Sequence, residues 1–308
     1  MLITVAICTF NRAESLRRTL GSLAAMRVPA DLKWELVVVN NDCNDHTDEV
    51  IASFAHRLPV RREYQPERGL SNARNCAVGA AKGDYIVWTD DDVLVGPEWL
   101  AAYADAFRRW PDAAVFGGTI IARYEPPVPK WILECETLLV GPHATRAFSD
   151  RVQPIFSTGG RVPFGSSYAL RTREQRAFRY DPAFGPHPGR PRLHDETDVI
   201  EKILRSGATG YTVPTARVEH CIGRDRQTVR YMIRWFAALG ESDALRYPER
   251  VGVTRWFGVP RWLWRRLIAE WARYRIHGLI SPAPVWMRHL RDYSLALGAI
   301  RYWRSHKS

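Results

Sequence analysis

Three adjacent aspartates, Asp90, Asp91 and Asp92, follow an apolar run in the stretch GDYIVWTDDDV, residues 83–93. Like charges placed side by side repel one another, so the cluster needs a partner that offsets it. One interpretation is a solvated turn that caps the following helix. The other is a hard divalent cation, Mg²⁺ or Mn²⁺, because such ions prefer oxygen ligands. A cation held by one or two carboxylates usually also binds phosphate oxygens, and we expect such a site here.

Basic residues lie just upstream of the aspartates. The segment ERGLSNARN, residues 67–75, carries Arg68 and Arg74 at the approach to a predicted helix. Helix N-termini and guanidinium groups both suit phosphate. The alternative is a solvated loop whose arginines pair with Glu67. Together with the three aspartates, the segment predicts a metal-bridged diphosphate.

The elements predicted around these residues alternate between strand and helix. Apolar runs at 2–8, 34–40 and 84–89 are typical of buried strands, and helical spacing marks 13–26 and 71–82. This order predicts an α/β fold with a doubly wound, largely parallel sheet. Ligands bind outside the carboxyl ends of the strands in such sheets. All three strands end in polar residues, so we expect a single site at that edge.

The rest of the chain continues the pattern and then becomes helical. A helix is predicted at 98–110 and a strand at 113–124, whereas residues 125–192 are rich in Pro and Gly, as substrate-facing loops often are. A short extended element ends at His220. Further helical patterns occur at 194–207, 227–247, 261–279 and 285–305.

The composition is that of a globular protein with its basic charge concentrated near the C-terminus. Of the 308 residues 46% are hydrophobic and 25% charged. The formal net charge is +11, and residues 255–308 hold 11 Lys and Arg against 2 Asp and Glu, a difference of +9. The same residues include 6 of the 12 tryptophans.

Cysteine usage and the N-terminal residues predict a cytoplasmic protein. The five cysteines form no CxxC pair, which argues against a zinc site or a disulfide framework. The first residues lack the basic start of a signal peptide, and no apolar run approaches the roughly 20 residues that cross a bilayer.

Six segments resemble the family 2 glycosyltransferases of the GT-A fold, a large bacterial group of inverting, nucleotide-sugar-dependent enzymes. They cover roughly residues 2–245 and read AICTFNRAESLRRTL, VVVNNDCNDHTDEV, ERGLSNARNCAVGAAKGDYIVWTDDDV, VPFGSSYALRTR, HDETDVIEKILRSG and RVEHCIGRDRQTVRYMIRWFAALGES. The third is the most diagnostic. The resemblance implies a GT-A catalytic domain at 1–224, built on a mostly parallel nucleotide-binding sheet, followed by a C-terminal helical extension at 225–308.

The resemblance also implies roles on the donor side. Asp92 would coordinate Mn²⁺ or Mg²⁺, while His220 is either a second metal ligand or a structural residue. Asp90 would approach the ribose. The expected nucleotide-sugar contacts are Thr9, Arg12, Asn40, Arg68, Arg74, Asp90 and Asp91.

Two positions depart from the family pattern. The family usually has an Asp after the second strand that reads the uracil edge, and here Asn40 stands there. An amide can still accept from the uracil ring N–H, so a UDP-sugar remains the expected donor. The family's Glu-Asp pair at the later helix is reversed to Asp195-Glu196. Either carboxylate could act as the general base, and we favour Glu196 with Asp195 as the alternative. A structural role is also open, with Asp195 capping the helix N-terminus and Glu196 in its first turn.

On the acceptor side, the resemblance and the residue types suggest Gly165, Ser166 and Trp131. Aromatic faces suit sugar rings, although Trp131 could equally be a loop packing residue. The expected acceptor is a hydroxyl of a glycan or of a lipid-linked glycan, in cell-envelope or exported polysaccharide synthesis.

The basic, tryptophan-rich residues 255–308 predict a peripheral contact with an anionic membrane, on the inner face of the plasma membrane. In a helix, Leu263, Leu267 and Trp271 share one face, while the arginines lie largely elsewhere. Packing on the catalytic domain or an oligomer contact is the second interpretation. Nucleic acid is the third and is not expected.

Three function classes follow from these observations. The leading hypothesis is a metal-dependent inverting glycosyltransferase. A nucleotidyltransferase on a related sheet would favour a Gly-rich, lysine-containing signature near the first strand, which CTFNRAES does not offer. A catalytically silent nucleotide-sugar- or carbohydrate-binding protein of the same fold is the remaining alternative.

Overall fold

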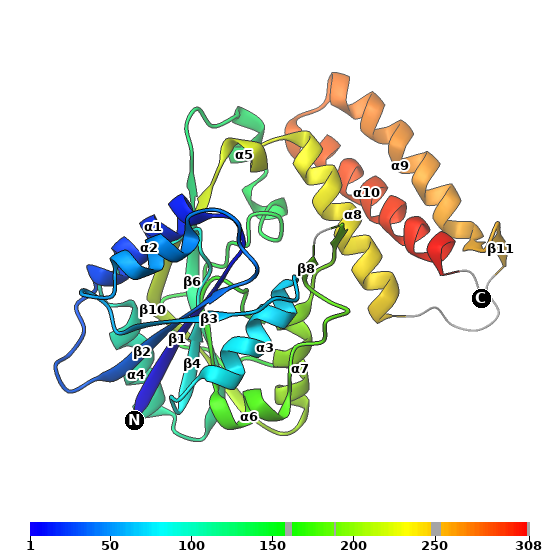
Figure 1. Ribbon diagram of the computed structural model, residues 1–308. Coiled ribbons are helices and arrows are strands. Elements are labelled where there is room, and N and C mark those ends of the chain that lie inside the picture. Colours follow the sequence, from blue (N-terminus) through cyan, green and yellow to red (C-terminus); the bar gives the residue numbers. More distant parts are fainter. Residues whose placement is uncertain (158–161, 188, 248–253, 307–308) are drawn as a thin grey trace. The chain divides into compact units, whose positions relative to one another are not determined.

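The computed structural model describes residues 1–157, 162–187, 189–247 and 254–306, and the chain divides into two compact units. The first unit comprises Met1–Arg123, Ala144–Pro188 and His194–Cys221. The second comprises Tyr124–His143, Gly189–Leu193 and Ile222–Ser308. The sheet belongs to the first unit, and the second is largely helical (Figure 1).

The first unit is built on an eight-stranded sheet in the order β3-β2-β1-β4-β7-β6-β10-β5, so the predicted α/β class is confirmed. Its strands are β1 (Leu2–Thr9), β2 (Lys33–Asn40), β3 (Val60–Tyr64), β4 (Tyr85–Trp88), β5 (Val93–Val95), β6 (Ala113–Tyr124), β7 (Tyr168–Arg171) and β10 (Thr209–Ile222). Its helices are α1 (Ala13–Ala24), α2 (Thr47–Ser53), α3 (Leu70–Ala80), α4 (Trp99–Arg109), α6 (Thr172–Ala177) and α7 (Asp195–Arg205). The short strand β8 (Pro186–His187) also belongs to this unit, whereas β9 (Arg190–Pro191) belongs to the second.

Strand direction decides which residues meet at the sheet edge. β1 pairs in parallel with β2 and β4, and β2 with β3, so the carboxyl ends of these four strands lie at one edge. β7 is antiparallel to both β4 and β6. β10 runs antiparallel to β5, with His220 opposite Val93, which brings His220 to the residues that follow β4.

Helices cover both faces of the sheet, because successive side chains of a strand point to opposite faces and here both sets are apolar. Ile3, Val5 and Ile7 of β1 belong to a core with α1, α2 and α4. Ala6, on the other face, belongs to a core with α3 and α7. Burial on both faces explains why the strands read as nearly continuous apolar runs.

The second unit is formed mainly by three helices, α8 (Val229–Arg246), α9 (Arg261–Ile280) and α10 (Ala283–Ser305). α10 lies against both α8 and α9 (Figure 1). The smaller elements are α5 (Lys130–Glu134), η1 (Glu136–Leu138), η2 (Arg224–Arg226), β11 (Arg255–Trp256) and β12 (Val259–Pro260). Among the described residues no helix combines the length and the apolar character needed to cross a membrane.

Glycines allow α8 and α10 to approach closely. A Cβ added to Gly298 would lie 1.8 Å from the Ala237 carbonyl oxygen, and one added to Gly240 would lie 2.1 Å from the Leu295 carbonyl oxygen. Any larger side chain at either position would force the two helices apart. These glycines are therefore packing residues, since glycine is otherwise a poor choice within a helix.

Candidate functional site

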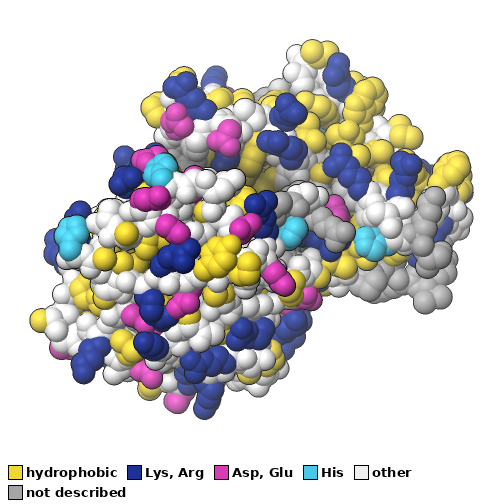
Figure 2. Space-filling view, viewed as in Figure 1, with side chains coloured by type: hydrophobic (Ala, Val, Ile, Leu, Met, Phe, Trp, Pro, Cys, Tyr) yellow, Lys and Arg dark blue, Asp and Glu magenta, His cyan; other side chains and the backbone are white. Residues whose placement is uncertain are grey.

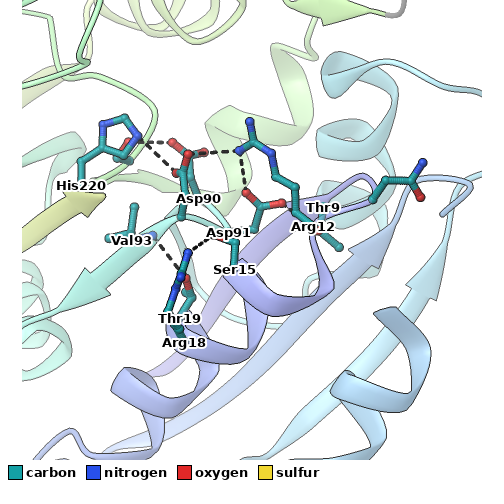
Figure 3. A network of polar contacts seen from close by, with 12 residues as sticks. Thr9, Arg12, Ser15, Arg18, Thr19, Asp90, Asp91, Val93 and His220 are labelled. Atoms are coloured by element: carbon teal, nitrogen blue, oxygen red, sulfur yellow. Dashed lines mark hydrogen bonds and ion pairs between the residues drawn. The ribbon is translucent and has the colours of Figure 1, made fainter. Parts of the chain in front are cut away.

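The aspartates after β4 point in different directions and bind different partners. Asp91 is buried and accepts a hydrogen bond from Thr9 Oγ1 at 2.7 Å. Asp92 Oδ1 lies 3.2 Å from His220 Nε2. Arg12 Nη1 lies 3.1 Å from both Asp91 Oδ1 and Asp92 Oδ2 (Figure 3). The guanidinium thus offsets the repulsion between two neighbouring carboxylates.

Burial gives Asp91 an unusual electrostatic environment. It raises the pKa of Asp91 to about 6, the charge of Asp92 adds to the increase, and Arg12 and Thr9 oppose it. The pKa of Arg12 is raised in turn, chiefly by the charge of Asp91. Asp91 therefore faces the protein interior, whereas Asp90 and Asp92 are more exposed.

Asp90 is the most exposed of the three aspartates and connects the sheet edge to β7. It accepts a hydrogen bond of 2.6 Å from Ser166 Oγ, just before β7. Thr89 Oγ1 donates to the Ser166 carbonyl oxygen at 2.9 Å, which fixes the same segment. Arg74 Nη2 lies 3.9 Å from Asp90 Oδ1. Asp90 is thus held between a hydroxyl and a guanidinium.

Arg74, on α3, is a buried cation with two carboxylates at the start of α7. Its Nη1 donates a short hydrogen bond to Asp195 Oδ2 and lies 3.5 Å from Glu196 Oε2. Although burial by itself lowers the pKa of Arg74, the charges of Asp195 and Glu196 raise it well above the usual value. The guanidinium also lies 5.4–6.0 Å from the ring centroids of Trp88, Tyr168 and Tyr180.

The two carboxylates of α7 differ in access. Asp195 is the first residue of the helix and its side chain is 3% exposed, whereas that of Glu196 is 18% exposed. Burial and the neighbouring Asp195 raise the pKa of Glu196 to about 8, and Arg74 opposes this. The helix N-cap is His194, with a φ of 77°, and its side chain makes no capping bond. Asp195 therefore does not cap α7, but serves as the counter-ion of Arg74.

Gly165 lies where three of these side chains meet. A Cβ added there would be 2.7 Å from Arg74 Nη2 and 3.7 Å from both Asp90 Oδ2 and Glu196 Oε1. The absence of a side chain at Gly165 lets the Arg74 guanidinium lie against the backbone here, and the carboxylates of Asp90 and Glu196 lie close by.

The Asp92–His220 pair is the arrangement that best fits a divalent cation. A carboxylate oxygen and an imidazole nitrogen are ligands that Mn²⁺ accepts, and Mg²⁺ usually takes one or two carboxylates together with substrate phosphates. Within the described residues, no three His, Cys, Asp or Glu side chains are grouped to hold a metal. The remaining ligands of a cation here would come from a diphosphate and water.

Comparison with known families settles the relationship of the chain. Residues 4–168, more than half of its length, match the family described as Glycosyl transferase family 2. The chain belongs to glycosyl transferase family 2. The resemblance inferred from the sequence segments is confirmed.

Curated relatives of this family 2 chain match less than half of its length. The succinoglycan biosynthesis protein ExoM of Rhizobium meliloti is 33% identical over 132 residues, which is 42% of this chain and 42% of ExoM. The validoxylamine A glucosyltransferase of Streptomyces hygroscopicus subsp. jinggangensis is 35% identical over 130 residues, 42% of this chain and 30% of that protein. The matches therefore span less than half of these relatives' length.

Solved structures match the family 2 chain over nearly its whole length. The mannosyltransferase PcManGT from Pyrobaculum calidifontis, in complex with GDP-Man and Mn²⁺, has a TM-score of 0.62 and 18% identity, covering 99% of this chain and 87% of that one. S. aureus TarS 1-349, in complex with UDP, has a TM-score of 0.57 and 14% identity, covering 98% and 91%. These similarities confirm the predicted GT-A fold.

Most of the residues predicted from the sequence lie at the same end of the family 2 sheet. Contacts link two groups of them: Thr9, Arg12, Asp91, Asp92 and His220 in one, and Arg74, Asp90, Gly165, Ser166, Asp195 and Glu196 in the other. Asp90 and Asp92 join the groups through the backbone. The roles of these residues stay predictions, but the convergence is a property of the fold.

Asn40 and Arg68 have partners that the sequence did not indicate. Asn40 is buried, its Nδ2 donates to Asp48 Oδ1 at 2.6 Å, and its Oδ1 accepts from the Cys43 N–H at 2.8 Å. Arg68 Nε donates to Asp42 Oδ2 at 2.8 Å. Both polar ends of Asn40 are thus engaged within the protein.

Trp131 belongs to the second unit, where its ring centroid lies 5.9 Å from that of Trp286. Its expected role on the acceptor side stays a prediction.

Several residues at the site were not singled out from the sequence. Tyr168 and Tyr180 enclose Arg74, and Phe10 lies under the Arg68 guanidinium at 5.1 Å. Phe10 lies in the segment of residues 9–12 that follows the first predicted strand, and this position in the sequence is a usable signal. Tyr180 lies in the loop-rich region, where nothing in the sequence distinguishes it.

Proposed function

We propose that this protein transfers a sugar from a nucleotide-sugar, most simply a UDP-sugar, to a hydroxyl of a glycan or lipid-linked acceptor with inversion at the anomeric carbon. The observation that carries the proposal is the convergence of Glu196 and Asp90 on Arg74, whose guanidinium lies 3.5 Å from Glu196 and 3.9 Å from Asp90. The proposed base thus lies close to a carboxylate that we expect on the donor side. Membership of family 2 supports it, as does the UDP bound to TarS.

Glu196 is the proposed general base. Its raised pKa of about 8 makes it a better proton acceptor than an ordinary carboxylate. It takes the proton of the acceptor hydroxyl, whose oxygen forms the new bond to the anomeric carbon on the face opposite the diphosphate. The old bond to the diphosphate oxygen breaks, and its electron pair leaves with the nucleoside diphosphate. The burial of Asp195 and its bond to Arg74 favour Glu196 over Asp195 for this role.

Asp92 and His220 are the proposed holders of Mn²⁺ or Mg²⁺. The cation, when bound, would stabilise the negative charge of the departing diphosphate. Mn²⁺ in the PcManGT complex supports this assignment. Arg12 lies against two of the aspartates and limits their repulsion before any ligand binds.

The proposed setting is polysaccharide synthesis at the inner face of the plasma membrane. The similarity to ExoM, a succinoglycan biosynthesis protein, supports the glycan product. Residues 255–308, of which 307–308 lie outside the described residues, are the proposed site of peripheral contact with an anionic membrane. Their charge difference of +9 supports this.

The test is hydrolysis of a panel of UDP-, GDP- and dTDP-sugars with Mn²⁺, Mg²⁺ or EDTA. We expect slow, metal-dependent loss of one donor, abolished by Asp92→Ala and retained in Asp150→Ala, which removes an exposed aspartate whose ion pair is with Arg217 and not with a predicted site residue. If no donor binds under any condition, the proposal is wrong.

A catalytically silent binding protein is the second candidate, favoured by the internal engagement of Asn40. It predicts that one donor binds with metal but is not cleaved, even with glycan acceptors present. Turnover of any donor excludes it.

A further inference from the structure

Helix α9 is apolar on two opposite sides. On its inner side Leu263 is buried, and Leu267 packs against the same cluster, which contains Val259, Ala296 and Ile300. The expectation that Leu263 and Leu267 form an outward membrane face with Trp271 is therefore wrong, because α10 and β12 cover these leucines. The outer side has other apolar residues, exposed by 65%, 57%, 87% and 75%: Ile268, Ile276, Leu279 and Ile280.

The outer side also carries unpaired basic charge. We define the α9 outer face as Arg265, Ile268, Ala272, Arg275, Ile276 and Leu279, whose spacing of three, four, three, one and three residues follows one side of a helix. Within the described part of the chain, Arg265 and Arg275 form no ion pair. Figure 2 shows apolar and basic side chains intermixed over this part of the molecule.

A second copy of the chain is a poor occupant for this face. The only acidic residue of α9, Glu270, is buried and lies 2.5 Å from Arg273 and 2.7 Å from His289. A symmetric pairing of two α9 helices would therefore bring arginines together without a counter-ion. The binding partner of this face must therefore combine negative charge with an apolar region.

We propose that the α9 outer face lies along the surface of a bilayer that contains anionic phospholipid. The 20-residue helix is about 30 Å long. Its exposed Ile and Leu side chains enter the acyl boundary, while the arginines reach the lipid phosphates. Trp262 and Trp271, also exposed, lie at the flanks, and tryptophan favours headgroup depth. The inference rests on the membrane contact of the proposed function and specifies which surface and which lipid take part.

The experiment is flotation of the full-length protein with vesicles of phosphatidylcholine alone or with 30% phosphatidylglycerol. We expect binding to the anionic vesicles only, weakened at least about ten-fold by Leu279→Glu, which puts a charge into the apolar boundary. Arg265→Ala with Arg275→Ala should weaken it about 25-fold, since each basic residue near an anionic surface contributes about five-fold. Ile121→Glu is the matched control, because it places the same charge at an exposed apolar residue of β6.

Donor hydrolysis by the same variants separates this inference from the proposed enzyme activity. We expect Leu279→Glu to hydrolyse donor like the unmodified protein while losing vesicle binding. Equal loss of binding in Ile121→Glu, or no binding to anionic vesicles at all, overturns the inference. A dimer that Leu279→Glu dissociates, without vesicle binding, would assign the face to self-association instead.

Discussion

Asp195 and Glu196 are adjacent carboxylates that contact the same buried guanidinium, that of Arg74, at different distances. Arg74 donates the direct hydrogen bond to Asp195, whereas Glu196 Oε2 lies 3.5 Å from the guanidinium and the Glu196 side chain is more exposed. Burying one unpaired charge costs several kcal/mol, so the Arg74–Asp195 bond has a structural reason to exist. Glu196 is the more exposed of the two carboxylates, which is why we propose it as the base.

Glu196→Gln should remove the proposed base while preserving the shape of the site. We expect kcat for sugar transfer to fall about 10³-fold, within the usual range for loss of a general base, with donor affinity nearly unchanged. Steady-state kinetics and calorimetric donor binding measure the two quantities. A variant that retains normal kcat would show that Glu196 is not the base.

Asp195→Asn should move the pH dependence rather than abolish activity. Glu196 acts as a base only when ionised, so kcat/KM rises as pH passes upward through its pKa of about 8. Removing the negative charge of Asp195 lowers this pKa, and the rise should shift to lower pH by about one unit. The pH profile of kcat/KM is the measurement.

Two results bear on that assignment. Asp198→Asn removes another carboxylate from the first turn of α7 and should leave the profile in place. If Asp195→Asn is inactive at every pH while Glu196→Gln is active, the roles of the two residues are reversed.

At the scale of elements, the packing of α8 on α10 depends on two glycines. Gly298→Ala would place a methyl group 1.8 Å from the Ala237 carbonyl oxygen, and we expect it to destabilise the protein by about 3 kcal/mol. Gly278→Ala in α9 is the matched control, because an added Cβ meets nothing within 4 Å there. It should stabilise by up to about 1 kcal/mol through helix propensity.

Denaturant unfolding followed by circular dichroism measures the free energy of unfolding of both glycine variants. We expect this free energy to fall in Gly298→Ala and to rise in Gly278→Ala. If Gly298→Ala stabilises as Gly278→Ala does, close packing of α8 and α10 is not what selects glycine at residue 298.

At the scale of the whole molecule, ligand binding should increase the free energy of unfolding. A nucleoside diphosphate with Mn²⁺, present at a hundred times its Kd, should raise the free energy of unfolding by about 2.7 kcal/mol. Thermal unfolding with and without EDTA measures this, and Asp92→Ala should remove the effect. An equal rise in the presence of EDTA would mean that nucleotide binding does not require the cation.

The order of elements and the chemistry of their ends could be predicted from the sequence. Buried parallel strands require continuous apolar runs, so β1, β2 and β4 are visible as such, and their polar ends Thr9, Asn40 and Asp90 mark one edge of the sheet. β7 could not be predicted, because it is four residues long within a Pro- and Gly-rich stretch. Its antiparallel position beside β4 is decided by contacts distant in the sequence.

What only the tertiary structure decided is which polar groups are free to act. The sequence by itself determined the residue types, including the aspartates at 90–92, the acidic pair at 195–196 and the basic C-terminal residues. It could not determine that Arg74 binds Asp195 or that Asn40 is engaged at both ends, because those partners come from other elements. Nor could it tell the covered side of α9 from the exposed one. Periodicity identifies the sides of a helix, but only the packing of its neighbours decides which side they bury.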